Sequence, residues 1–153
     1  MEVKEIISLV LSAMLGTLGF SIFFRSNKSR VFACVIGGML VTLAYVGCVS
    51  ISDNLFFQNF VPGLVATAYA EIMARVMKAP ATPILVCSAI SLVPGGRLYY
   101  TTYYLVINDA VNFNKELTEM LQVAAGITLG ITFISVIVYE INRNKSKQIF
   151  EMK

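Results

Sequence analysis

Long apolar runs with almost no charged residues constrain this chain more than any other feature. A helix needs about 20 apolar residues to cross the hydrocarbon core of a bilayer, where no water bonds an exposed backbone. Five stretches of the 153 residues meet or approach that length, and 57% of all residues are hydrophobic. The sequence therefore predicts an all-α integral membrane protein, with residues 1–153 forming a single transmembrane domain.

Short connections join the five predicted spans. The spans cover Val3–Phe24, Val31–Ser52, Leu55–Lys78, Ile84–Ile107 and Leu117–Tyr139. An acidic, asparagine-rich segment precedes the last of them. We interpret the first run as a retained span, because acidic residues flank its start and its charge-free length of about 19 residues exceeds that of a signal peptide.

The distribution of lysine and arginine predicts the orientation, because basic residues are retained on the cytoplasmic side. With five crossings, all the main basic groups fall on one side: Arg25, Lys28, Arg30, Arg75, Lys78, Arg143, Lys145, Lys147 and Lys153. The opposite side receives Asp53, Asp109, Glu116 and Glu119. We expect the N-terminus outside, the C-terminus inside, and residues 140–153 to form a basic cytoplasmic tail.

The composition argues against catalysis. The chain has no histidine, which excludes the common nucleophile pairs and most zinc sites. Cys34, Cys48 and Cys87 lie inside apolar runs, where free thiols behave as small hydrophobes. No paired catalytic groups or cofactor motif is present. We therefore expect no enzyme activity, no metal and no cofactor.

Small residues recur at four-residue spacing in several spans, which predicts close helix packing. These stripes are Ser8, Ser12 and Gly16; Ala33 and Gly37; Gly63, Thr67 and Glu71; and Gly126 and Gly130. They fit either packing within the bundle or contact with a second subunit.

The fourth predicted span contains a break. The stretch "ISLVPGGRLYY", Ile90 to Tyr100, places Pro94, Gly95 and Gly96 near its middle. Proline removes a helical hydrogen bond and disfavours helix at the residue before it, and glycine weakens the helix further. We expect two half-helices, with Pro94 at the first position of the second. The free amides there would form an anion site of the kind transporters use for carboxylates.

Arg97 lies in the first turn of that second half-helix. An arginine near the bilayer centre costs about 2.5–3.5 kcal/mol on insertion scales, so it should face a carboxylate, a water-filled cavity, an anionic substrate or a subunit contact. The remaining alternative is that its side chain snorkels to an interface. Glu71 is the nearest candidate partner, although Glu71 and Arg75 also have the spacing of a local pair. Glu71 or Asp109 could instead carry a proton during transport.

Four tyrosines follow the break. Tyr103 and Tyr104 lie near the predicted outer interface, where aromatic belts are expected. Tyr99 and Tyr100 lie deeper, so their hydroxyls need partners and could line a polar path.

Three segments carry a family resemblance: "TLGFSIFF", "YAEIMARVMKAPAT" and "LVPGGRLYYTTYYLV" followed by "ND". Their order and spacing resemble the small, five-helix, YjjB-like subunit of the threonine/serine exporter family over most of the chain. The resemblance implies a half-transporter in a bacterial cytoplasmic (inner) membrane. It also implies a longer, YjjP-like partner subunit and export of threonine and serine, or of dicarboxylates such as succinate.

The positions that match the family pattern are Glu71, Arg75, Lys78, Pro80, Pro94, Gly95, Gly96, Tyr99, Tyr100 and Asp109. Ser91 stands where similar members usually carry a second proline, and Arg97 occupies a position that is often small in the family. Two halves with an odd number of spans would enter the membrane inverted relative to each other, the architecture that supports alternating access.

We therefore expect one half of a secondary exporter of small carboxylate-bearing metabolites. Its expected substrate site comprises Pro94, Gly95, Gly96, Arg97, Tyr99 and Tyr100. A non-transporting assembly or regulatory subunit and a self-assembled channel are the alternatives. The expected partners are the larger subunit, the lipid bilayer and the substrate, with self-association as another source of the missing half; nucleic acid is not expected.

Overall fold

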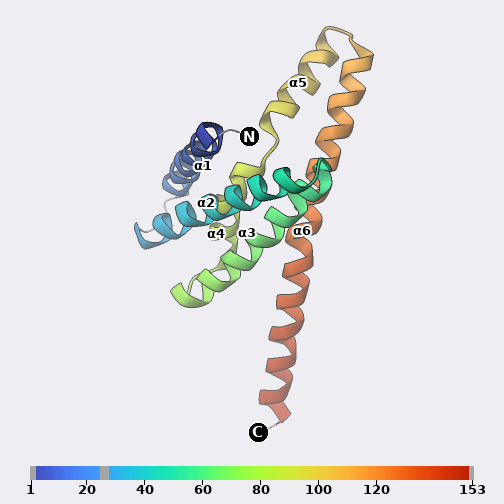
Figure 1. Ribbon diagram of the computed structural model, residues 1–153. Coiled ribbons are helices and arrows are strands. Elements are labelled where there is room, and N and C mark those ends of the chain that lie inside the picture. The colour runs from blue at the N-terminus through green and yellow to red at the C-terminus, as the bar shows by residue number, and fades with distance from the viewer. Residues whose placement is uncertain (1–2, 25–27, 152–153) are drawn as a thin grey trace.

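The computed structural model describes residues 3–24 and 28–151, with side chains up to residue 144, and every regular element within these ranges is a helix. The elements are α1 (Val3–Phe23), α2 (Lys28–Ile51), α3 (Leu55–Met77), α4 (Ala81–Ala89), the 3₁₀ helix η1 (Ile90–Leu92), α5 (Gly95–Val106) and α6 (Ala110–Glu151) (Figure 1). The predicted all-α fold is confirmed. Arg25, Lys153 and the side chains of Lys145 and Lys147 lie outside the described residues, so the orientation and the basic tail stay predictions.

Four helices are long and apolar enough to cross a membrane: α1, α2, α3 and the Ala110–Asn144 part of α6. The fifth candidate span is a bent pair, because Ala81–Leu92 and Gly95–Val106 meet at an angle of 57°. The interruption predicted in the fourth span is thus confirmed. This span begins at Ala81, three residues before the predicted Ile84, since Pro80 has the extended backbone of an N-cap and Pro83 lies in the first helical turn.

The last helix is longer than predicted. It begins at Ala110 rather than Leu117 and continues to Glu151 rather than Tyr139. The acidic segment is helical because Asp109 caps it: the Oδ1 atom of Asp109 accepts a hydrogen bond from the Asn112 amide at 3.2 Å. The 42 residues of α6 extend about 63 Å at 1.5 Å per residue, roughly twice the thickness of the hydrocarbon core.

Helix α3 lies at the centre of the bundle and packs against α2, α4 and α6. It starts at the N-cap Asn54, whose side chain accepts from the amides of Phe56 and Phe57, and it ends where Lys78 adopts a left-handed conformation with φ of 48°. Where α3 meets α6, an added Cβ atom at Gly126 would lie 2.5 Å from the Phe56 carbonyl oxygen. This crossing therefore requires glycine.

The predicted small-residue stripes have two different environments. Ala33, Gly37, Gly63, Thr67, Gly126 and Gly130 are buried between helices, as close packing requires. Ser8, Ser12 and Gly16 of α1 are exposed, and a Cβ atom at Gly16 would meet nothing within 4 Å. Among the described residues, the α1 stripe therefore has no helix packed over it.

Buried hydroxyls are satisfied mostly by their own helices. Thr17, Thr42 and Thr67 each donate to the carbonyl oxygen four residues earlier, at 2.8–3.0 Å. Tyr69 of α3 instead donates across to the Ala33 carbonyl oxygen of α2 at 2.7 Å. These bonds let polar groups lie inside an apolar bundle, where an unpaired hydroxyl is costly. The three cysteines are buried and free, as their apolar surroundings predicted.

Helix α5 and the beginning of α6 form an arm, residues 95–122, that projects from the bundle (Figure 1). Helix α5 packs against α6 along this arm. At its tip Asn108 has a positive φ of 57°, and the Asp109 amide bonds the Tyr104 carbonyl oxygen at 3.0 Å. The base of the arm is the break in the fourth span.

Candidate functional site

The backbone of the break leaves donors unused at the start of α5. Val93 is extended, with φ of −62° and ψ of 122°, and Pro94 is the N-cap of α5 rather than its predicted first residue. The Gly95 amide bonds the Val93 carbonyl oxygen at 2.8 Å, and the Leu98 amide bonds that of Pro94 at 3.0 Å. Among the described amides of this first turn, those of Gly96 and Arg97 are left for a ligand.

A cavity of about 550 Å³ opens beside the break, a size typical of small-molecule sites. Four bundle helices, α1, α2, α3 and α6, line it together with residues 90–97. The bundle contributes Leu9, Ser12, Ala13, Gly16, Thr42, Tyr45, Leu55, Asn59 and Val123. The exposed stripe of α1 thus has a role: Ser12 and Gly16 form part of the cavity wall.

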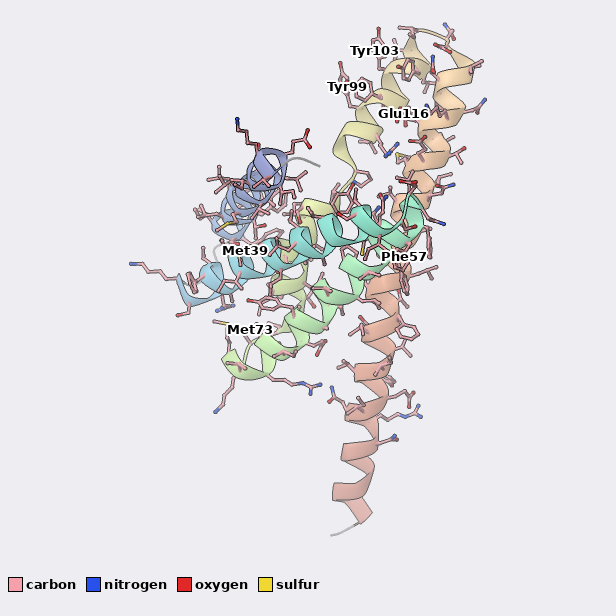
Figure 2. The ribbon with its side chains drawn as sticks, in the orientation of Figure 1. Met39, Phe57, Met73, Tyr99, Tyr103 and Glu116 are labelled. Carbon is pink, nitrogen blue, oxygen red and sulfur yellow. The ribbon has the colours of Figure 1, made fainter. Side chains whose placement is uncertain are left out.

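The structure brings four of the six predicted substrate residues to this cavity. Pro94, Gly95, Gly96 and Arg97 line it. Tyr99 and Tyr100 do not, and their side chains lie exposed on α5. Tyr99 stacks on Tyr103 with ring centroids 6.4 Å apart, and both lie on the side of α5 that faces away from α6 (Figure 2).

Two glutamates of α6 pair with the Arg97 side chain. Its Nη1 atom donates to the Oε2 atom of Glu119 and lies 3.7 Å from the Oε2 atom of Glu116. The three side chains are 22–31% exposed, so water only partly screens these ion pairs. The candidate pairing of Arg97 with Glu71 is therefore wrong, because the arm turns the guanidinium toward α6 rather than α3.

Glu71 and Arg75 lie on the last turns of α3, and neither lines the cavity. The ion pairs of the described side chains do not include them, so the local Glu71–Arg75 pair is not formed either. Lys78 and Pro80 serve the turn between α3 and α4 as C-cap and N-cap.

Asp109 lies at the tip of the arm, where it caps α6. The Asn112 side chain donates to its Oδ2 atom at 2.6 Å, and the Asn112 amide donates to Oδ1. These bonds lower the pKa of Asp109, because they stabilise its charged form. The Asp109 carboxylate therefore has a structural role as the cap of α6.

Sequence reasoning missed Glu116 and Glu119 as site residues. It placed both in or beside a connecting segment, whereas they lie on the second and third turns of α6. Their spacing of three residues was the available signal, since it places both on one face of a helix. Asn59 of α3 was missed as well, and it lines the cavity while its amide donates to the Leu55 carbonyl oxygen at 2.8 Å.

The all-helical bundle of apolar spans is that of a multi-pass membrane protein, and a broken span beside a cavity is an arrangement that transporters use for their substrate sites. The family model described as "Threonine/Serine exporter, ThrE" matches residues 9–137. The chain therefore belongs to the threonine/serine exporter family, as its motifs predicted. Neither the curated proteins nor the solved structures contain a match to it.

Proposed function

We propose that this chain is one subunit of a secondary exporter of small carboxylate-bearing metabolites: threonine and serine, or a dicarboxylate such as succinate. The observation that carries the proposal is the break at Pro94–Gly96, which lines a cavity of about 550 Å³ in a member of an exporter family. Two first-turn amides are free there for a carboxylate, and the Arg97 side chain, which bonds Glu119, lines the same cavity. The proposed setting is a bacterial cytoplasmic membrane.

The exporter needs a second half. Five spans, counting the bent pair as one, fit a half-transporter that pairs with a larger, inverted partner subunit. Co-purification from native membranes tests this, with a larger membrane protein as the expected companion. If the larger protein alone transports at full rate, this chain is an assembly or regulatory subunit. Ion conduction by the chain alone would make it a channel.

The proposed site can be tested by filling the cavity. A Cβ atom added at Gly96 would meet no atom within 4 Å, so Gly96→Leu starts from open space and adds volume where Gly96 lines the cavity. Gly19→Leu is the matched control, because Gly19 is equally open but does not line the cavity.

Both variants and the wild-type chain, with any co-purified partner, are reconstituted in vesicles and assayed for export of labelled serine, threonine and succinate. Gly96→Leu should insert normally and lose export, while Gly19→Leu should retain it. Unchanged export by Gly96→Leu would reject the site.

Two proposed coupling residues have weaker support. Glu71 lies outside the cavity, and Asp109 is engaged in capping α6.

A further inference from the structure

One buried side chain of the cavity wall keeps an unused hydrogen-bond acceptor. Asn59 of α3 is only 4% exposed, and it lines the cavity. Its Nδ2 atom donates to the Leu55 carbonyl oxygen at 2.8 Å. A carbonyl oxygen can only accept, so this bond fixes which way the amide points and leaves the Oδ1 atom on the other side. Among the described residues, no group donates a hydrogen bond to this Oδ1 atom.

The free oxygen of Asn59 is reached from the cavity. Among the described side chains, the Oγ atom of Ser88 is the one polar atom that is both fully buried and unpaired. The Oδ1 atom of Asn59 is unpaired as well, so it must retain some accessible surface. The cavity is the open space that this buried residue borders. A buried acceptor is costly when nothing donates to it, so this position favours a donor from a ligand.

Packing fixes where the acceptor lies. Asn59 is at the crossing of α3 and α6, where a Cβ atom added at Gly126 would lie 3.3 Å from the Asn59 Cβ atom. The bond to Leu55 holds the other end of the side chain. The Oδ1 atom is therefore preorganised, as a residue that selects between ligands must be.

The charges around the cavity indicate which kind of donor fits. Within the described part of the chain, Arg97 is the one charged residue that lines the cavity, and the two glutamates that pair with it do not. An ammonium group that leaves water needs a carboxylate or several acceptors, whereas one neutral acceptor satisfies the single donor of a hydroxyl group. The amide oxygen of Asn59 therefore matches a hydroxyl group.

We propose that Asn59 is a specificity-determining residue, whose Oδ1 atom accepts a hydrogen bond from a hydroxyl group of the exported carboxylate. The inference rests on the proposed function and names the substrate class of the same site: a small carboxylate that carries a hydroxyl group. The free amides of Gly96 and Arg97 bind the carboxylate at the break, and Asn59 binds the hydroxyl group from α3. A ligand without the hydroxyl group leaves Oδ1 unpaired, so it binds more weakly.

The test compares L-serine with L-alanine, which differ by one hydroxyl group. Equilibrium binding of each is measured by calorimetry on the full chain, purified with any partner. The wild-type protein should bind serine about 2- to 10-fold more tightly, which is the contribution of one neutral hydrogen bond. Asn59→Leu keeps the branched shape of the side chain without its polar atoms, and it should bind serine and alanine with equal affinity.

Gln58→Met is the matched control. Gln58 is the neighbouring buried amide of α3, 6% exposed, and its Nε2 atom donates to the Ser52 carbonyl oxygen at 2.7 Å, but it does not line the cavity. This variant should keep the preference for serine. Asn59→Ala repeats the test with a smaller side chain, should leucine prevent folding, and it should also lose the preference. A role in stability alone would lower the unfolding midpoint of both Asn59 variants and leave the ratio of the two affinities unchanged.

The outcomes separate the inference from the proposed function. An unchanged ratio in Asn59→Ala overturns the inference, and so does a wild-type protein that binds alanine as tightly as serine. An equal loss of serine and alanine binding in Asn59→Leu would assign the Oδ1 atom to the ammonium group and overturn it as well. Binding and export of succinate without binding of serine would overturn the inference and leave the export function intact. A preference for serine in binding, with no export from vesicles, would support the inference and overturn the proposed function.

Discussion

Two regions of this protein use glycine for opposite reasons. At the crossing of α3 and α6, Gly63, Gly126 and Gly130 let two backbones touch, and a Cβ atom at Gly63 would lie 3.1 Å from the Ile127 carbonyl oxygen. At the break, a Cβ atom added at Gly95 or Gly96 would meet nothing within 4 Å, and both glycines line a cavity. The comparison teaches that a small residue in a membrane helix marks either a tight contact or an opening, and only the neighbouring helices distinguish them.

The two regions also differ in how they are held. The crossing depends on packing between uncharged residues, since its contacts involve Phe56, Asn59 and Phe60. Two ion pairs near its base, from Arg97 to Glu116 and Glu119, join the two helices of the arm. At its tip, Asp109 caps α6. We therefore expect the crossing to respond to added volume and the arm to respond to lost charge.

The largest expected effect is at the crossing. Gly126→Ala would push a methyl group to 2.5 Å from the Phe56 carbonyl oxygen, and relief of such overpacking costs about 1–3 kcal/mol. Thermal unfolding of the purified variant should show a lower midpoint. Gly96→Ala is the matched control and should be neutral or slightly stabilising, because alanine favours helix by about 1 kcal/mol over glycine. Equal losses in the two variants would break the comparison.

A smaller loss is expected at the base of the arm. Arg97→Gln leaves Glu116 and Glu119 without their cation, and removing one member of a buried ion pair costs about 3–5 kcal/mol. Because these side chains are 22–31% exposed, we expect about 1–2 kcal/mol, seen as a lower unfolding midpoint. Arg143→Gln, which breaks the exposed pair with Glu140, should change the midpoint little. Full stability of Arg97→Gln would show that the pair does not fasten the arm.

The smallest effect is expected at the tip. Asp109→Ala removes the cap of α6 and should loosen the first turn, measured as faster amide exchange at Asn112 and Phe113. The lowered pKa of Asp109 means that its ionised form stabilises the fold. This contribution is present above the unfolded-state pKa and is lost as the pH falls through the lowered pKa, below about 3.9. Asp109→Asn, which also caps, should keep slow exchange and lose that pH dependence.

The sequence by itself determined the spans, the break and the family. Length and apolarity are local properties of each run, and a proline followed by two glycines interrupts a helix wherever it packs. The same local reasoning placed Pro94, Gly95 and Gly96 correctly as the site of the interruption. It was wrong about the start of α6, since the cap formed by Asp109 and Asn112 outweighed the polar character of the segment.

Only the tertiary structure decided the partner of Arg97 and the role of the small stripe on α1. Glu71 was a candidate by position along the chain, but the bend of 57° carries α5 onto α6, where Glu119 and Glu116 lie. Ser12 and Gly16 have the spacing of a packing face, yet they form a cavity wall because no helix within residues 3–24 and 28–151 covers them. Both outcomes depend on the angles at which helices cross, and those angles are set by contacts between residues far apart in the sequence.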